Sequence, residues 1–279
     1  MSNKITSFFK KNCIKKSPSL SERKLLKNIR KGFENQEFKM YLQFIVDSKE
    51  GKISSAETLS RWVNSSGEVV FPGTYIGIME KSGLITRFDY YMFEKVCQKL
   101  SQWKDSELSD VSLSCNLTRI TISEKDFAEK IEEISNKYDF DKSKLIIEIT
   151  EDSVEKNLVT AMLNIIDTKK LGFRIALDDI GGGYTSLVSL FEYPIDYVKI
   201  DREILLLAET EKGKKLFTGI VALAHSLDLD VVCEGVETEE QKKFVVDSDC
   251  DYIQGWYYAK ALSEDEAEKF AIDYMNKSL

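Results

Sequence analysis

From residue 39 onward, short β-branched apolar runs alternate with amphipathic stretches of helical period. Such runs predict buried strands, and apolar positions three and four apart predict helices packed against them. The predicted strands are 39–47, 53–62, 111–117, 144–150, 173–178, 195–200, 229–234 and 251–254. Helices are predicted near 74–82, 88–103, 124–137, 155–170, 202–206, 211–227, 238–247 and 264–276. Eight strands with helices between them predict an α/β fold, a (β/α)8 TIM-like barrel, whose usual size is about 250 residues.

The first two predicted strands depart from this pattern. Only the short segment 48–52, centred on Lys49-Glu50-Gly51, separates them. A parallel neighbour needs a crossover connection of about a dozen residues or more, whereas a hairpin needs only a short turn. We therefore expect these two strands to be antiparallel to each other.

Charge is distributed unevenly along the chain. Residues 1–32 hold ten Lys or Arg and one acid, so they carry about +9, and the remainder carries about −17 of the net −8. The segment SLSERKLLKNIRKGF predicts a helix with Ser19 or Ser21 as N-cap. We expect a basic N-terminal tail over 1–20 and one barrel domain over 21–279. The simplest interpretation is a solvated tail; the alternative is contact of Phe8, Phe9 and nearby lysines with an anionic membrane or partner.

Several function classes are disfavoured by composition. A net charge of −8 disfavours a general nucleic-acid binder, and no apolar run reaches the roughly 20 residues that span a bilayer. The N-terminus lacks the apolar core of a signal peptide. The five cysteines are odd in number and lack C-x-x-C spacing, which favours free thiols in the cytoplasm. His225, the only histidine, is interpreted as a packed or capping residue rather than a metal ligand.

Polar residues interrupt or end the apolar strands. Each one alone has a structural explanation, such as a turn, an ion pair or a surface position. Together they predict a site, because buried strands should be apolar and barrel active sites lie at the carboxyl ends of strands. These residues are Gln43, Glu57, Asn116, Glu148, Asp178, Asp179, Lys199, Asp201, Glu234 and Gln254.

The side chains at these strand ends offer mainly oxygen ligands. Glu57, Asn116, Glu148, Asp178 and Asp179 would suit Mg²⁺ or Mn²⁺, with Ca²⁺ as a competitor that inhibits by holding water and phosphorus out of line. Two such ions are typical of phosphodiester cleavage. Lys199 would place a positive charge near the attacking water, and Glu234 or Glu237 would orient the water or take its proton. The glycine-rich stretch DDIGGGYTSL after a strand is interpreted as a mobile loop over the substrate.

Seven ordered motifs carry a family resemblance: AETLSRW, CNL, EITE, DDIGGGYTSL, KIDR, CEGVET and DYIQGW. The sequence resembles the EAL domain family of cyclic-di-GMP phosphodiesterases over about residues 22–272. The resemblance implies hydrolysis of cyclic di-GMP to linear pGpG, and a homodimer, since many members are dimers.

The resemblance also implies roles for individual residues. Glu57, Asn116, Glu148 and Asp178 would hold one metal ion, and Asp178 would bridge to a second ion beside Asp179. Lys199 and Glu234 would serve the attacking water. Nucleotide contacts and support of the site would come from Gln43, Arg61, Asp201, Glu237 and Gln254, and Glu151 would anchor the glycine-rich loop.

Some positions depart from the family pattern. Thr58 replaces the alanine after the signature glutamate, and strand alternation should turn it toward the helices. Ile180 and Gly182 alter the loop, which keeps open the alternative of a catalytically weak or inactive cyclic-di-GMP receptor or protein-interaction module. A phosphodiesterase for another nucleotide is a further alternative. The aromatic run 88–93 is interpreted as core or subunit interface, with Phe88, Tyr91 and Met92 on one side, rather than as a nucleotide-stacking platform.

Overall fold

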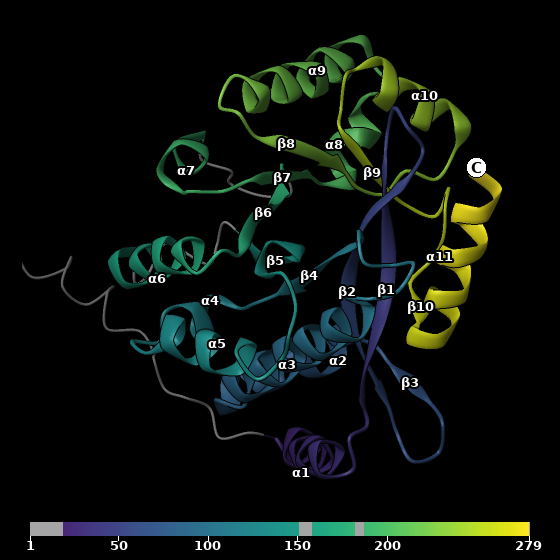
Figure 1. The fold of residues 1–279 in the computed structure, drawn as a ribbon. Helices are drawn as coiled ribbons and strands as arrows, with labels where there is room; N and C mark the ends of the chain where they lie inside the picture. Colours follow the sequence, from purple (N-terminus) through teal and green to yellow (C-terminus); the bar gives the residue numbers. More distant parts are fainter. Residues whose placement is uncertain (1–18, 151–157, 182–186, 279) are drawn as a thin grey trace, which may run out of the picture.

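Eight strands pair side by side until the sheet closes on itself as a barrel (Figure 1). The computed structural model describes residues 19–150, 158–181 and 187–278. Two short strands, β3 (Val69–Val70) and β10 (Leu262–Ser263), extend the barrel by pairing with β2 and β1. The barrel strands are β1 (Phe38–Asp47), β2 (Ile53–Val63), β4 (Ser112–Asn116), β5 (Leu145–Thr150), β6 (Arg174–Ile180), β7 (Tyr197–Ile200), β8 (Asp230–Cys233) and β9 (Tyr252–Gln254). The (β/α)8 barrel predicted from the sequence is confirmed.

The β1–β2 pair is an antiparallel hairpin, as its short connection predicts. Asp47 Oδ1 accepts hydrogen bonds from the backbone nitrogens of Lys49 at 2.9 Å and Glu50 at 2.6 Å. Gly51 completes the turn with φ of 68°, a conformation that glycine adopts without steric cost. β1 is also antiparallel to β9, which closes the barrel, whereas the pairs from β2 and β4 through β8 and β9 are parallel.

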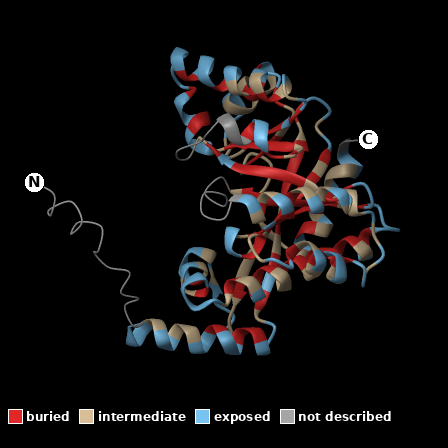
Figure 2. Ribbon diagram, turned by 90° about the vertical axis from the view of Figure 1, so that its left-hand side faces the viewer, coloured by how far each residue is buried: buried red, intermediate tan, exposed pale blue. Residues whose placement is uncertain are grey.

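Helices surround the barrel, and Figure 2 shows their buried sides turned toward the strands. They are α1 (Leu20–Glu34), α2 (Pro72–Ser82), α3 (Ile85–Trp103), α4 (Arg119–Ile122), α5 (Phe127–Ser135), α6 (Leu158–Lys170), α7 (Leu187–Glu192), α8 (Arg202–Leu207), α9 (Glu211–His225), α10 (Glu239–Asp247) and α11 (Glu264–Ser278), with a 3₁₀ turn at Lys142–Lys144. The short elements α4, α7, β3 and β10 were not predicted. Within the described ranges, no helix is both long enough and apolar enough to cross a membrane.

The first helix, α1, begins as predicted at a serine cap. The Ser19 side chain accepts from the Glu22 backbone nitrogen, and the Glu22 side chain accepts from the Ser19 nitrogen, which forms a capping box. The chain before residue 19 lies outside the described residues, so the division into a tail and a barrel domain stays a prediction.

Side chains of the parallel strands alternate between the helices and the barrel interior, as a pleated strand requires. The helix-facing positions belong to the main hydrophobic core and include Ile147, Ile149, Ile175, Leu177 and Val198. Interior positions lower in the barrel form a small separate cluster of Ile146, Ala176 and Tyr197 with Tyr252. The next interior position on each of three strands is charged, namely Glu148, Asp178 and Lys199. A charged layer therefore lies directly above an apolar one inside the barrel.

Candidate active site

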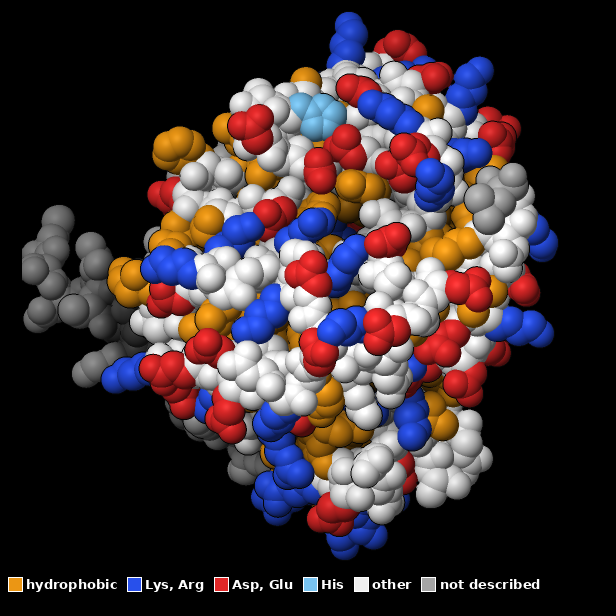
Figure 3. Space-filling model, in the orientation of Figure 1, with side chains coloured by type: hydrophobic (Ala, Val, Ile, Leu, Met, Phe, Trp, Pro, Cys, Tyr) orange, Lys and Arg blue, Asp and Glu red, His pale blue; other side chains and the backbone are white. Residues whose placement is uncertain are grey.

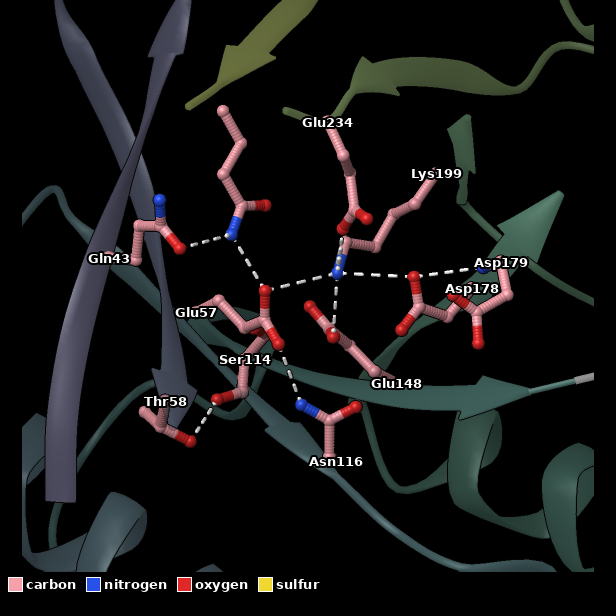
Figure 4. A network of polar contacts seen from close by, with 11 residues as sticks. Gln43, Glu57, Thr58, Ser114, Asn116, Glu148, Asp178, Asp179, Lys199 and Glu234 are labelled. Carbon is pink, nitrogen blue, oxygen red and sulfur yellow. Dashed lines mark hydrogen bonds and ion pairs between the residues drawn. The ribbon is translucent and has the colours of Figure 1, made fainter. Parts of the chain in front are cut away.

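Lys199 lies at the centre of the charged layer (Figure 4). Its Nζ lies 2.6 Å from Glu234, 2.9 Å from Glu148 and 3.3 Å from both Glu57 and Asp178. The Lys199 side chain is only 2% exposed, so water screens these contacts little. Four strands and the residue after β8 thus supply one ammonium and four carboxylates that contact it.

Both carboxylate oxygens of Glu57 accept hydrogen bonds. Asn116 Nδ2 donates to Glu57 Oε1 at 2.9 Å, and Gln254 Nε2 donates to Glu57 Oε2 at 2.7 Å. Gln43 lies beside them, with its Oε1 at 3.5 Å from Gln254 Nε2. Gln43 reaches the site from the middle of β1 because it is paired with Glu57 across the antiparallel hairpin. The sequence-based placement of Gln43 at a carboxyl strand end is therefore wrong, although its side chain does join the network.

Asp178 and Asp179 end the regular pairing of β6. Asp178 Oδ1 accepts from the Asp179 backbone nitrogen at 3.0 Å, and Asp179 has φ of 62°, which is uncommon for a residue other than glycine. The left-handed turn lets both consecutive carboxylates approach Glu234: one ligand oxygen from each of the three lies within 4.8 Å of the others. A regular strand would have turned the second carboxylate to the opposite face.

The barrel interior strongly perturbs these ionisable groups. Burial, with the charges of Glu57 and Asp178, raises the pKa of Glu148 well above its usual value despite Lys199. Burial also raises the pKa of Glu234 to about 8, and partial burial with the neighbouring Asp178 raises the pKa of Asp179 to about 6. Three carboxyl groups therefore hold protons more tightly than usual in this electrostatic environment.

The pKa values of Glu57 and Lys199 shift in the direction that favours the charged form of each side chain. Burial opposes ionisation of Glu57, but Lys199 and the hydrogen bonds from Gln254 and Asn116 hold its pKa below the usual value. Burial would lower the pKa of Lys199, yet the surrounding carboxylates raise it well above the usual value. The Lys199 ammonium therefore stays charged, and four carboxylates surround it.

The donor set fits hard divalent cations. All its carboxylates offer oxygen, the Asp178–Asp179–Glu234 oxygens are already close together, and one ammonium cannot balance the cluster. Gln254 Oε1 is buried in this layer, and the structure shows no hydrogen-bond partner for it among the described residues. Mg²⁺ and Mn²⁺ prefer such oxygen donors, and an added cation would relieve the repulsion.

Other predicted site residues lie outside this network. The Arg61 guanidinium lies over the rings of Phe71 and Tyr41, at 4.8 and 5.6 Å. Asp201 caps α8 by accepting from the Glu203 nitrogen at 2.7 Å, and Glu237 pairs with Arg202 at 3.0 Å. Glu151, Gly182 and Gly183 fall outside the described residues. Gly181 has φ of 98°, and a Cβ there would lie 2.3 Å from Ile204, so the loop must begin with glycine.

Thr58 and His225 lie where the sequence predicts. Thr58 faces away from the charged layer, is buried, and donates to the Ser114 carbonyl at 2.5 Å. His225 is the last residue of α9, and its Nε2 lies 2.8 Å from Asp251 Oδ2. Neither residue contributes a ligand to the charged layer.

Asp89 is a buried acid that the sequence analysis did not single out. It lies on α3, is 3% exposed, and its Oδ2 accepts three hydrogen bonds, from Thr118 N, Thr118 Oγ1 and Thr121 Oγ1. Burial raises its pKa to about 6. A buried acid inside the apolar run of a predicted helix is the sequence signal that could have identified it.

Asp89 lines a cavity of about 460 Å³ beside the charged layer. Asn116 and Leu59 lie on its inner side, and Ile76, Phe88 and Met92 supply apolar walls. Phe88 also packs against Phe33, Phe38 and Tyr75, so the aromatic run is core, as predicted.

A second cavity of about 230 Å³ lies across Leu59 from the first. Glu57, Glu234 and Gln254 reach it from the charged layer, and Trp256 lies at its edge with 57% of its surface exposed. Leu59 lines both cavities; the smaller one reaches Glu57 and Glu234 of the charged layer, whereas the larger one reaches the layer through Asn116, which donates to Glu57.

Comparison with known families agrees with this geometry. The family model of the EAL domain matches residues 26–261. The chain belongs to the EAL domain family. The resemblance stated from the sequence motifs is thereby confirmed.

Relatives of this EAL domain include two curated bacterial proteins. The signaling protein YkoW of Bacillus subtilis is 31% identical over 246 residues, which are 88% of this chain and 31% of YkoW. MucR of Pseudomonas aeruginosa, a bifunctional diguanylate cyclase/cyclic di-GMP phosphodiesterase, is 27% identical over 243 residues, which are 87% of this chain and 36% of MucR. The chain spans about a third of the length of these relatives.

A solved structure of similar fold is the EAL enzyme Bd1971 with cAMP and cyclic di-GMP bound. It matches with a TM-score of 0.84 and 26% identity over 90% of this chain and 69% of that chain. The barrel of this chain is thus the EAL fold.

Proposed function

We propose that this EAL domain hydrolyses cyclic di-GMP to linear pGpG with two divalent cations, Mg²⁺ or Mn²⁺. The observation that carries the proposal is the charged layer, in which one buried ammonium contacts four carboxylates beside a fifth, Asp179. The family membership, the phosphodiesterase activity named for MucR and the cyclic di-GMP bound to Bd1971 support it. The predicted homodimer and cytoplasmic location remain predictions.

Glu57, Asn116, Glu148 and Asp178 would hold one cation, and Asp178 with Asp179 would hold the second. Such cations supply charge neutralisation for the phosphoryl oxygens and a more acidic water. Hydrolysis joins a water oxygen to one phosphorus and breaks the bond from that phosphorus to a ribose 3′-oxygen. The 3′-oxygen gains a proton and leaves as a hydroxyl, which opens the ring.

Glu234 is our candidate for the group that takes the proton from water. Among the four carboxylates on Lys199 its side chain is the most exposed, at 20%, so water reaches it most easily. Lys199, at 2.6 Å, fixes Glu234 Oε1 and brings a positive charge next to the reacting phosphate.

The two cavities suit the two ends of the nucleotide. In the larger one, Asp89 is an acceptor among apolar walls, which complements the two adjacent N–H donors on the edge of guanine. In the smaller one, the exposed Trp256 ring, which has Lys260 Nζ over one face at 4.4 Å from its centroid, offers its other face for base stacking. A dinucleotide lying across Leu59 would place its phosphates over the charged layer.

The test is incubation of the purified full chain with cyclic di-GMP and Mn²⁺ or Mg²⁺, followed by chromatography of the products. We expect pGpG with either ion, none after chelation with EDTA, and binding without cleavage in Ca²⁺. Tight cyclic di-GMP binding with any cation or none, and no product at any metal concentration, would instead establish the receptor alternative.

A further inference from the structure

The first helix, α1, carries a basic surface that the proposed hydrolysis does not use. Five exposed Lys and Arg residues lie on it: Arg23, Lys24, Lys27, Arg30 and Lys31. Lys24, Lys27, Arg30 and Lys31 form no ion pair with any residue that the structure describes. At a rise of about 1.5 Å per residue, they form a row about 10 Å long on an otherwise acidic protein.

α1 is attached to the domain mainly through its last turns, while nearer its start Leu25 packs against the core and Glu22 lies 3.7 Å from Lys81 of α2. Its buried residues, Ile29, Gly32 and Phe33, belong to the last turns. The Phe33 ring contacts Phe38 at 4.9 Å and fixes that end to the barrel. Leu20, at the other end, is 85% exposed, and Figure 2 shows the exposed first half of α1 extending past the rest of the domain.

Basic side chains are visible where α1 lies. Figure 3 shows several Lys and Arg side chains at the lower edge, where Figure 1 places α1, besides others scattered over the same face. Leu26, which is half-buried, lines the same face of α1 as Arg23, Lys27 and Arg30. Basic residues interspersed with bulky apolar ones are typical of segments that lie on anionic membrane surfaces.

We propose that the basic surface of α1 docks this protein onto an anionic lipid surface. Each Lys or Arg near such a surface contributes about 1 kcal/mol, and the attraction decays within a Debye length of about 8 Å. The projecting position of α1 lets its charges enter that layer while the acidic barrel stays outside it. A long nucleic acid fits less well, because the described part of α1 offers no aromatic side chain on its exposed face for base stacking.

The test is sedimentation of the full chain with vesicles of phosphatidylcholine alone or mixed with phosphatidylglycerol, at physiological and at high salt. We expect binding only to the mixed vesicles, and its loss at high salt. The triple variant Lys24→Gln/Lys27→Gln/Arg30→Gln should bind about 10²-fold more weakly, from three charges of about 1 kcal/mol each. Its melting temperature and cyclic di-GMP binding should match those of the unmodified chain.

A matched control removes three exposed charges from α9: Lys212→Gln/Lys214→Gln/Lys215→Gln. It has the same net charge as the α1 variant and should keep full vesicle binding. Equal loss in both variants would overturn the proposal in favour of a general charge effect. Equal binding to neutral vesicles, tighter binding to a DNA or RNA oligonucleotide, or lipid-independent self-association through α1 would also overturn it.

Discussion

Replacing the central ammonium by an apolar side chain of similar length, Lys199→Met, tests the electrostatic account of the site. The change leaves four carboxylates within 2.6–3.3 Å of the lost charge without their common partner. Removing one partner of a buried ion pair costs about 3–5 kcal/mol of unfolding free energy. The total should not reach four times that value, because Glu148 and Glu234, whose pKa values are already raised, can take up protons.

For 279 residues, with an unfolding entropy of about 2.1 cal/mol/K per residue, this loss lowers the melting temperature by about 5–9 °C in EDTA. The more negative site should bind Mn²⁺ more tightly, so the rise in melting temperature on adding Mn²⁺ should exceed that of the unmodified chain. The deficit should also shrink at lower pH. A carboxyl group whose folded pKa is raised destabilises the fold increasingly as pH rises, and this effect is relieved as protons bind.

The measurement is calorimetry in EDTA and in Mn²⁺, together with turnover of cyclic di-GMP, which should fall on the order of 10²-fold or more. The matched control is Lys99→Met. Lys99 is also buried and lies 3.1 Å from Glu264 and 2.9 Å from Glu268, but it joins α3 to α11 far from the charged layer. It should lose stability and keep both its turnover and its response to Mn²⁺. An unchanged melting temperature and Mn²⁺ response in Lys199→Met would refute the reasoning.

Four further outcomes are expected. Glu57→Ala and Asp178→Asn should each remove nearly all turnover with the circular dichroism spectrum intact; near-normal turnover in either would contradict its role as a metal ligand. Glu234→Gln should lose about 10²–10⁴-fold in turnover and still bind cyclic di-GMP, whereas loss of binding with turnover kept at saturation would make Glu234 a binding residue. Asp89→Asn should raise KM about 10–100-fold, and KM of the unmodified enzyme should rise as pH falls through about 6, because protonation removes the acceptor; a KM independent of both changes would exclude Asp89 from base recognition. Tyr91→Ala, which removes the hydrogen bond to the Phe38 carbonyl at 3.2 Å, should lower the melting temperature more than the substrate affinity, and the reverse order would favour a stacking role.

The barrel could be predicted from the sequence because local pattern and global fold agree in it. Each of the eight predicted strands became a barrel strand, and the five-residue connection between β1 and β2 left only the hairpin. The elements that escaped prediction, such as β3 and α4, are two and four residues long. Segments that short show no periodicity, and their conformation is set by the neighbours they pair with.

The charged layer could be predicted for the same reason, whereas its neighbours could not. Glu148, Asp178 and Lys199 each interrupt a strand that would otherwise be apolar, so the sequence itself marks them. Asp89 gives a weaker signal, because one acid in a helix is normally solvated. Its burial depends on Thr118 and Thr121, which only the folded chain brings to it.

Strand alternation also explains why the departure from the family pattern at Thr58 leaves the charged layer intact. Glu57 and Thr58 are adjacent in sequence, yet one side chain meets Lys199 inside the barrel and the other bonds the Ser114 carbonyl on the helix side. A substitution at position 58 should therefore change the packing and the wall of the larger cavity, which Thr58 lines, and leave the metal ligands in place. The alternation of side chains along β2 thus places the proposed ligand Glu57 inside the barrel and places Thr58 in the wall of the larger cavity.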